Sequence, residues 1–300
     1  MHKQTKLFAT STLLAAGLGG VAMAQSASGF YMDGYLTANY VSTGTSVTHL
    51  GDITLGYDGI GGMPLGMEVN LLEFGGGSSV EYALTGGIYY DTDFGRFTVG
   101  QPRPAVDDYL AEISLGNSAQ MNYTGLSYIR SVTQAQMVLN PSDFKYGARF
   151  DGSFNGIDYG ISLHALNPDG VIVTAGASYD FGQYYTLGAG IERIPGILAD
   201  DMTYFASIKA DYGNFGGSFL IRNDTGMLGT VYNANAYYDW NNLEVFVDYM
   251  GDASGGYHNI GVEYTFMDNG YVGVENIGNG TTWFSNNYNI YAGWSFSIGG

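Results

Sequence analysis

The residues best suited to chemistry lie in an acidic segment from Pro102 to Met121. It carries three carboxylates, at Asp107, Asp108 and Glu112. Adjacent carboxylates repel each other, and their oxygens are the ligands that hard cations prefer, so Asp107 and Asp108 are candidate Ca²⁺ ligands. The same side chains could instead line a channel, be solvated on a surface loop, or act as an acid–base pair. We expect no cofactor apart from this candidate Ca²⁺ ion.

A second set of residues has the types found in a hydrolase triad. Ser162 and His164 alternate along one predicted strand with Asp158 on the same face. A triad needs hydrogen-bond reach from nucleophile to base and from base to carboxylate. Residues two apart on a strand are predicted to be too far apart for a direct relay, so we interpret the three as polar lining. The chain has no cysteine and its histidines lack zinc-site spacing, and we expect no enzyme.

The N-terminus has the pattern of an export signal. Lys3 and Lys6 precede the apolar run from Leu7 to Val21, which ends at the A-x-A-like sequence Ala22-Met23-Ala24. This pattern predicts a signal peptide over residues 1–24 and a single mature domain over residues 25–300. The alternative, a transmembrane anchor, is disfavoured because the run is short and rich in alanine, glycine and threonine.

Charge narrows the classes of partner. Charged residues make up only 13% of the chain, about half the usual share of a soluble domain. The predicted mature chain carries eight basic and 28 acidic residues, a net charge of −20. Such a field excludes nucleic acid as a partner and favours cations.

Alternation of apolar and polar residues recurs along nearly the whole mature chain. In 144–151, for example, Phe144 and Phe150 fall on the face opposite Lys145 and Arg149. This period of two predicts strands, and turn signals such as Asn155-Gly156 between them predict antiparallel hairpins. No helical periodicity is found beyond the signal peptide. The other alternating segments are 29–41, 49–57, 65–72, 79–90, 94–101, 157–165, 171–181, 184–193, 202–212, 215–222, 229–239, 243–249, 260–266 and 287–298, with shorter or less regular ones at 122–129, 133–139 and 271–277.

So many antiparallel strands are expected to close on themselves, because an open sheet of this size exposes its edges. A soluble sandwich pair or solenoid is the alternative to a transmembrane barrel. Aromatic residues near strand ends, as in Tyr237-Tyr238 and Trp283-Phe284, favour the barrel, since aromatic girdles mark both membrane interfaces. We predict an all-β, transmembrane, antiparallel β-barrel of 16 strands, with 18 as the other count, around an aqueous interior.

The C-terminal YAGWSFSIGG resembles the terminal signal of Gram-negative outer-membrane barrels. Two further stretches give the chain a family resemblance: FGRFTVGQ (94–101) followed by the acidic loop, and the Gly-aromatic hairpin AGASYDFGQYYTLGAG (175–190). The chain resembles the general diffusion porins of Gram-negative bacteria, specifically the alphaproteobacterial type. The resemblance implies that the third external loop, Pro102–Met121, folds into the barrel and narrows it, and that the protein is a homotrimer in the outer membrane.

The resemblance also assigns roles to individual residues. Asp107, Asp108 and Glu112 would form the acidic side of the constriction. The facing basic wall would be formed by inward-pointing residues: Arg96, Lys145, Arg149, Lys209 and Arg222.

The function predicted from these features is a water-filled channel for passive diffusion of small hydrophilic solutes, with a preference for cations. Membrane lipid would contact its outer face. The alternatives are an outer-membrane β-barrel enzyme, a protease or lipase, and a structural or adhesive barrel with a closed lumen.

Overall fold

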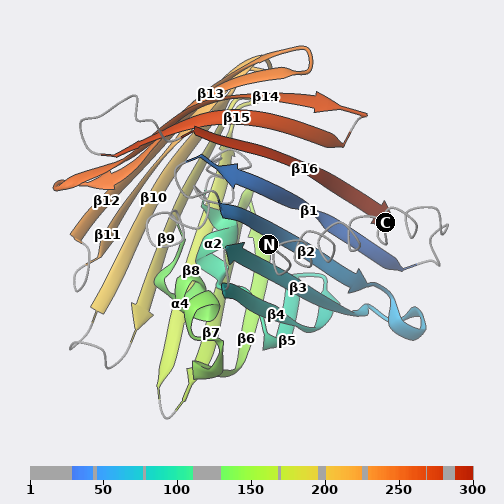
Figure 1. Ribbon diagram of the computed structural model, residues 1–300. Coiled ribbons are helices and arrows are strands. Elements are labelled where there is room, and N and C mark those ends of the chain that lie inside the picture. Colours follow the sequence, from blue (N-terminus) through green and yellow to red (C-terminus); the bar gives the residue numbers. More distant parts are fainter. Residues whose placement is uncertain are drawn as a thin grey trace.

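The computed structural model of the protein is a closed antiparallel barrel of 16 strands (Figure 1). It describes residues 29–42, 46–76, 79–110, 130–167, 170–194, 201–224, 229–267, 269–279 and 288–299. Each strand pairs with its neighbour in sequence, and β16 closes the ring on β1. The predicted fold class and strand count are therefore confirmed, whereas the predicted signal peptide lies outside the described residues.

The strands are β1 (Phe30–Val41), β2 (Ser46–Tyr57), β3 (Leu65–Gly76), β4 (Ser79–Thr92), β5 (Gly95–Gln101), β6 (Phe144–Phe154), β7 (Ile157–Leu166), β8 (Val171–Phe181), β9 (Tyr185–Ile194), β10 (Asp201–Asp211), β11 (Phe215–Asp224), β12 (Gly229–Trp240), β13 (Leu243–Asp252), β14 (Gly255–Phe266), β15 (Gly270–Asn279) and β16 (Tyr288–Gly299). Two α-helices, α2 (Ala105–Tyr109) and α4 (Val132–Leu139), and two 3₁₀ turns, η1 (Ile60–Gly62) and η2 (Pro141–Asp143), complete the described elements.

Short turns set the register of the hairpins. Asn155 and Gly156, between β6 and β7, both have positive φ, 51° and 79°. Left-handed backbone at both central positions is the type I′ geometry, whose twist matches that of the flanking strands. The predicted Asn-Gly hairpin is thus confirmed.

The chain between β5 and β6 corrects the prediction of an all-strand mature chain. The segment 133–139, scored above as an irregular strand, belongs to helix α4. The Ser131 side chain accepts a hydrogen bond from the backbone N–H of Gln134 at 3.0 Å, so Ser131 caps the helix. The sequence Ser131-Val-Thr-Gln134 has the S-x-x-Q form of a capping box, a signal that the alternation count overlooks. The segment 271–277 is a strand, part of β15, and 122–129 lies outside the described residues.

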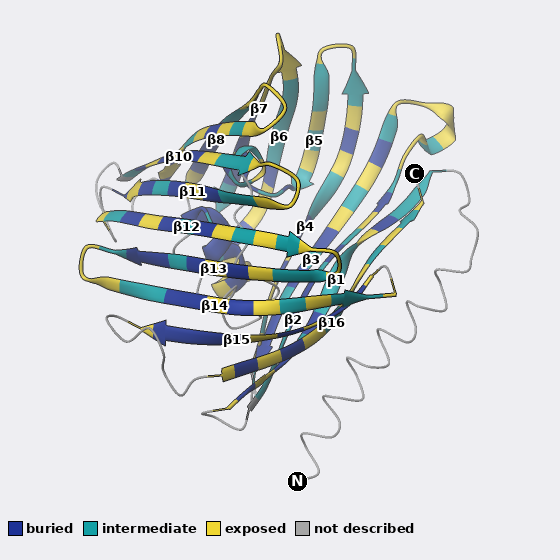
Figure 2. Ribbon diagram, turned by 90° about the horizontal axis from the view of Figure 1, so that it is seen from above, coloured by how far each residue is buried: buried dark blue, intermediate teal, exposed yellow. Residues whose placement is uncertain are grey.

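The two faces of the barrel differ in polarity. Apolar side chains such as Val99 (62%), Ile88 (55%) and Ile290 (53%) are exposed, while polar ones such as Asn289 are buried on the inner side. Exposed and buried residues alternate along the strands (Figure 2). Aromatic rings lie at the strand ends, where Tyr212 stacks on Tyr184 and on Phe215. An apolar outer band with aromatic ends is the surface of a barrel that contacts lipid. Among the described residues, no helix is both long and apolar enough to cross a bilayer.

The apolar band provides the first test. Val99→Arg places a charge on the outward face in the middle of β5, and we expect it to lower the free energy of unfolding in lipid vesicles by about 2–4 kcal/mol. Thr98→Arg is the matched control, since its side chain faces the interior, and a smaller loss is expected. Urea unfolding followed by tryptophan fluorescence measures both. Equal losses in the two variants would contradict the assigned faces.

Candidate functional site: a charged cavity beside the loop between β5 and β6

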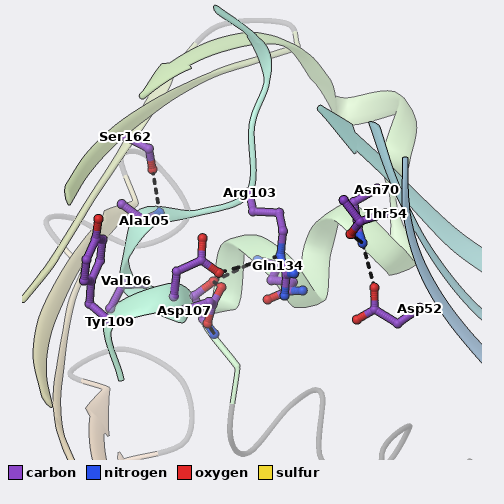
Figure 3. A network of polar contacts seen from close by, with 12 residues as sticks. Asp52, Thr54, Asn70, Arg103, Ala105, Val106, Asp107, Tyr109, Gln134 and Ser162 are labelled. Atoms are coloured by element: carbon purple, nitrogen blue, oxygen red, sulfur yellow. Dashed lines mark hydrogen bonds and ion pairs between the residues drawn. The ribbon is translucent and has the colours of Figure 1, made fainter. Parts of the chain in front are cut away.

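The loop that follows β5 begins against the inner wall of the barrel. Pro102 and Pro104 cannot donate to a strand ladder, so the sheet ends there. The next two backbone N–H groups bond to the wall: Ala105 N donates to Ser162 Oγ at 3.0 Å (Figure 3), and Val106 N to Thr174 Oγ1 at 3.4 Å. Helix α2 therefore lies on the inner faces of β7 to β9. The described beginning of the loop thus contacts the inner wall, and residues 111–121 lie outside the described residues.

A row of glycines makes this close approach feasible. Gly160, Gly176 and Gly190 lie directly opposite one another on β7, β8 and β9. A Cβ atom at Gly190 would lie 2.2 Å from Val106 Cγ2, and one at Gly176 would lie 3.0 Å from Val106 Cα. Two of these glycines belong to the Gly-aromatic hairpin that carries the resemblance, and their role is to seat α2.

The second helix of the loop is anchored by a carboxylate from the wall. Glu192, on β9, is fully buried. It accepts hydrogen bonds from Val132 N at 2.9 Å and from Thr133 N at 2.8 Å, and a third from the Thr133 hydroxyl. These N–H groups open α4 and have no partner within the helix, so a carboxylate there satisfies them and complements the helix dipole. The sequence analysis did not single out Glu192.

Two further contacts hold the loop together where α4 begins. The Asp107 carboxylate accepts from Ser131 N at 2.7 Å and from the Ser131 hydroxyl at 2.6 Å, which ties α2 to α4. Arg222, predicted to point inward, does so and is almost fully buried; its Nη1 donates to the carbonyl of Arg130 at 3.0 Å. Asp107 and Arg222 thus position the loop.

Asp108 turns away from Asp107 and faces a charged cavity. Arg149, on β6, forms ion pairs with Asp108 and with Asp151, the latter at 2.6 Å between Nη2 and Oδ1. Arg103 Nε lies 3.9 Å from Asp108 Oδ1, and the Tyr109 hydroxyl donates to Asp151 at 2.7 Å. The cavity has a volume of about 380 Å³ and is lined by Glu68, Thr85, Gly86, Gly87, Tyr89, Arg96, Thr98, Pro102, Arg103, Asp108, Tyr109, Arg149 and Asp151.

The surroundings of the two aspartates shift their pKa values in opposite directions. Burial raises the pKa of Asp107, and its bonds to Ser131 offset this only in part. Burial also acts to raise the pKa of Asp108, but Arg103 and Arg149 outweigh it and hold that pKa below the ordinary value. Asp108 therefore carries a negative charge at neutral pH, and a third of its side chain stays exposed.

Two other predicted site residues, Arg96 and Lys145, do not pair with Asp108. Arg96 lines the same cavity, but it pairs with Asp91 at 2.7 Å and lies over the Tyr89 ring. Lys145 is exposed at the irregularity between Phe144 and Tyr146, and it is not among the residues that line the cavity.

Glu112 lies outside the described residues. The cavity also contains residues that the sequence analysis did not name as site residues: Arg103, Tyr109 and Asp151. Arg103 directly follows Pro102 in the acidic loop, and this position is the one signal that could have identified it.

The contacts of Asp107 and Asp108 do not fit a shared Ca²⁺ ion. Both oxygens of Asp107 accept from Ser131, and Asp108 pairs with arginines, so protein donors occupy the two carboxylates separately. In the described ranges, no group of three or more acidic or histidine side chains is arranged to hold a metal.

The structure corrects one statement about the triad-like residues. Ser162 Oγ and His164 Nε2 are 2.8 Å apart, so the prediction that they are too distant for a hydrogen bond is wrong. Both are nonetheless buried, at 0% and 1% exposure, and Ser162 accepts from Ala105 N of α2. His164 Nδ1, which a triad carboxylate would contact, has no hydrogen-bond partner among the described residues. No relay to Asp158 is formed, and the pair supports α2.

Comparison with known proteins identifies the fold. No family model matches the chain, and no curated protein matches it in sequence. Solved porin structures match its fold over most of the chain. A multiple mutant of the Rhodopseudomonas blastica porin superposes with a TM-score of 0.59 at 13% identity, covering 90% of this chain and 100% of the porin. A triple mutant of the same porin gives 0.58 at 13% identity with the same coverage.

The chain therefore has the fold of the bacterial porins, which confirms the resemblance at the level of architecture. Among the solved structures that it is similar to is the porin of Rhodopseudomonas blastica. At this identity the similarity establishes the fold alone.

Proposed function

We propose that the protein is an outer-membrane channel of a Gram-negative bacterium, through which small hydrophilic solutes diffuse passively. The observation that carries the proposal is the closed barrel with an apolar outer face, a polar inner face and a charged cavity beside the loop. A barrel of this strand number is wide enough for an aqueous interior. One of the similar structures is an engineered protein studied for asymmetric conductivity, which agrees with a channel.

In the proposed mechanism, the loop limits solute size and the charges around it select among ions. The three arginines of the cavity, Arg96, Arg103 and Arg149, lie with three carboxylates, those of Glu68, Asp108 and Asp151. The inner wall across the barrel from this cavity carries acidic side chains without lysine or arginine. After Arg222 the chain contains no lysine or arginine, whereas acidic residues lie on the inner faces of β12 to β15: Asp239, Glu244, Asp248, Glu263 and Glu275. This asymmetry favours cations.

Reconstitution into planar bilayers tests the function. We expect discrete conductance steps. In a KCl gradient, we expect a reversal potential whose sign shows that K⁺ permeates more readily than Cl⁻. Absence of conductance from correctly folded protein would overturn the channel, and anion selectivity would overturn the cation preference alone. The porin resemblance further predicts a homotrimer, which native mass spectrometry of the detergent-solubilised protein would detect.

A further inference from the structure

A second group of acidic side chains lies on the inner wall, away from the charged cavity. Asp248 on β13 faces Asn259 on β14 in register, and Glu275 on β15 is within hydrogen-bond reach of the same asparagine. The alternate residues of these strands, such as Val247 and Ile260, are exposed on the outer face, so the three polar side chains point inward.

The two carboxylates are joined through one amide group. Asn259 Nδ2 lies 2.6 Å from Glu275 Oε2 and 3.3 Å from Asp248 Oδ2. Asn289 Nδ2, on β16, contacts the other Glu275 oxygen at 2.6 Å. Asp248, Asn259 and Glu275 are each only 1% exposed, so water hydrates them very little. Both carboxylates thus accept hydrogen bonds from neutral amide donors.

The charge of Asp248 has no counter-charge among the described residues. It forms no ion pair there with a lysine or arginine, and its acidic neighbours Glu275 and Glu244 repel it. A buried carboxylate stays ionised only when it pairs with a cation or a metal, and is otherwise protonated, because removing an ion from water is costly. The strands from β12 to β16 contain no lysine or arginine, so a cation that pairs with Asp248 would come from solution.

Two buried oxygens also lack partners. Asp248 Oδ1 and Asn259 Oδ1 have no hydrogen-bond donor within the described part of the chain. Buried acceptors are almost always satisfied, and each exception calls for an explanation such as an ion. A 180° rotation of the Asn259 amide would bring its oxygen to the position between the two carboxylates, and the two orientations are not distinguished by shape.

We propose that Asp248, Asn259 and Glu275 form a binding site for a divalent hard cation, with Ca²⁺ as its chemical type. The set supplies two carboxylates and one amide oxygen, a purely oxygen environment that suits Ca²⁺ or Mg²⁺ better than zinc or copper. Two negative charges match a divalent ion, and side chains on three separate strands suit the flexible geometry of Ca²⁺. The site differs from Asp107 and Asp108, whose oxygens serve Ser131 and the arginines.

Calorimetric titration of the folded full-length barrel in detergent with CaCl₂ tests the site, after removal of metal with EDTA. We expect binding by the wild-type protein and at least tenfold weaker binding by Asp248→Asn and by Glu275→Gln. Asp158→Asn is the matched control, because it removes the same charge from the exposed inner wall of β7 and is expected to bind Ca²⁺ normally.

A gain-of-affinity variant keeps the site testable if those substitutions impair folding. Asn259→Asp adds a third carboxylate, and we expect it to bind Ca²⁺ more tightly and to unfold at a lower temperature when Ca²⁺ is absent. No Ca²⁺ binding by the wild-type protein at millimolar concentration would overturn the site in favour of a protonated carboxylate. Unchanged binding in Asp248→Asn would place the ion elsewhere and also overturn it. Neither result bears on conduction, which the bilayer experiment measures separately.

Discussion

Glu192→Ala is expected to release α4 from the wall of the barrel. The substitution removes the acceptor of three hydrogen bonds and leaves Val132 N and Thr133 N buried without a partner. Each unsatisfied group costs about 1–3 kcal/mol, so the docked position of α4 loses several kcal/mol relative to an undocked one. The ring of strands is untouched, since every strand remains paired with two neighbours. We therefore expect a folded barrel with a loosened loop.

The proposed channel gives this change a direct readout. Single-channel records of Glu192→Ala are expected to show a larger mean conductance and more current noise, and proteases are expected to cleave near α4 more readily. Glu192→Gln is the graded control, because its amide oxygen still accepts one or two of the hydrogen bonds. Wild-type conductance, noise and cleavage in Glu192→Ala would show that the carboxylate does not hold the loop.

Most of the fold was predictable because a strand leaves a local signal. Inward and outward residues alternate with a period of two, and the Asn-Gly turn has a defined backbone geometry, so 16 strands could be counted. Segment 133–139 was misread because nearly the whole helix is buried against the barrel wall, so its apolar residues do not form the single stripe of an amphipathic helix. Its cap, Ser131 with Gln134, was the better local signal.

The site was less predictable because its partners are distant in sequence. Asp108 and Arg149 were both named from charge and position, yet their ion pair spans 41 residues. Glu192 is 59 residues from Thr133, and nothing local distinguishes it from other polar residues of the inner face. The seat of α2 depends on three glycines that meet only when β7, β8 and β9 pair.

Arg149→Gln is expected to make the channel more selective for cations. Arg149 lies between Asp108 and Asp151 with only 11% of its side chain exposed, and it also donates to the carbonyl of Arg103. Removing the guanidinium leaves the cavity more negative by one charge, so a several-fold rise in the K⁺ to Cl⁻ permeability ratio is expected from the reversal potential. The substitution also lowers the free energy of unfolding. Breaking a fully buried ion pair costs about 3–5 kcal/mol, and because Asp108 is partly exposed we expect a loss of about 2 kcal/mol.

The same substitution is expected to change the pH dependence of selectivity. Asp108 has a lowered pKa, so its charge is present above that pKa and is lost as the pH falls through it. Without Arg149 the pKa of Asp108 rises, and cation preference is therefore lost at a higher pH than in the wild-type channel. Arg149→Lys is the matched control, because it keeps the charge without the two-pronged geometry, and Asp108→Asn is expected to lower cation preference. If Arg149→Gln and Arg149→Lys show the same selectivity at every pH, the charge of Arg149 does not act on permeating ions.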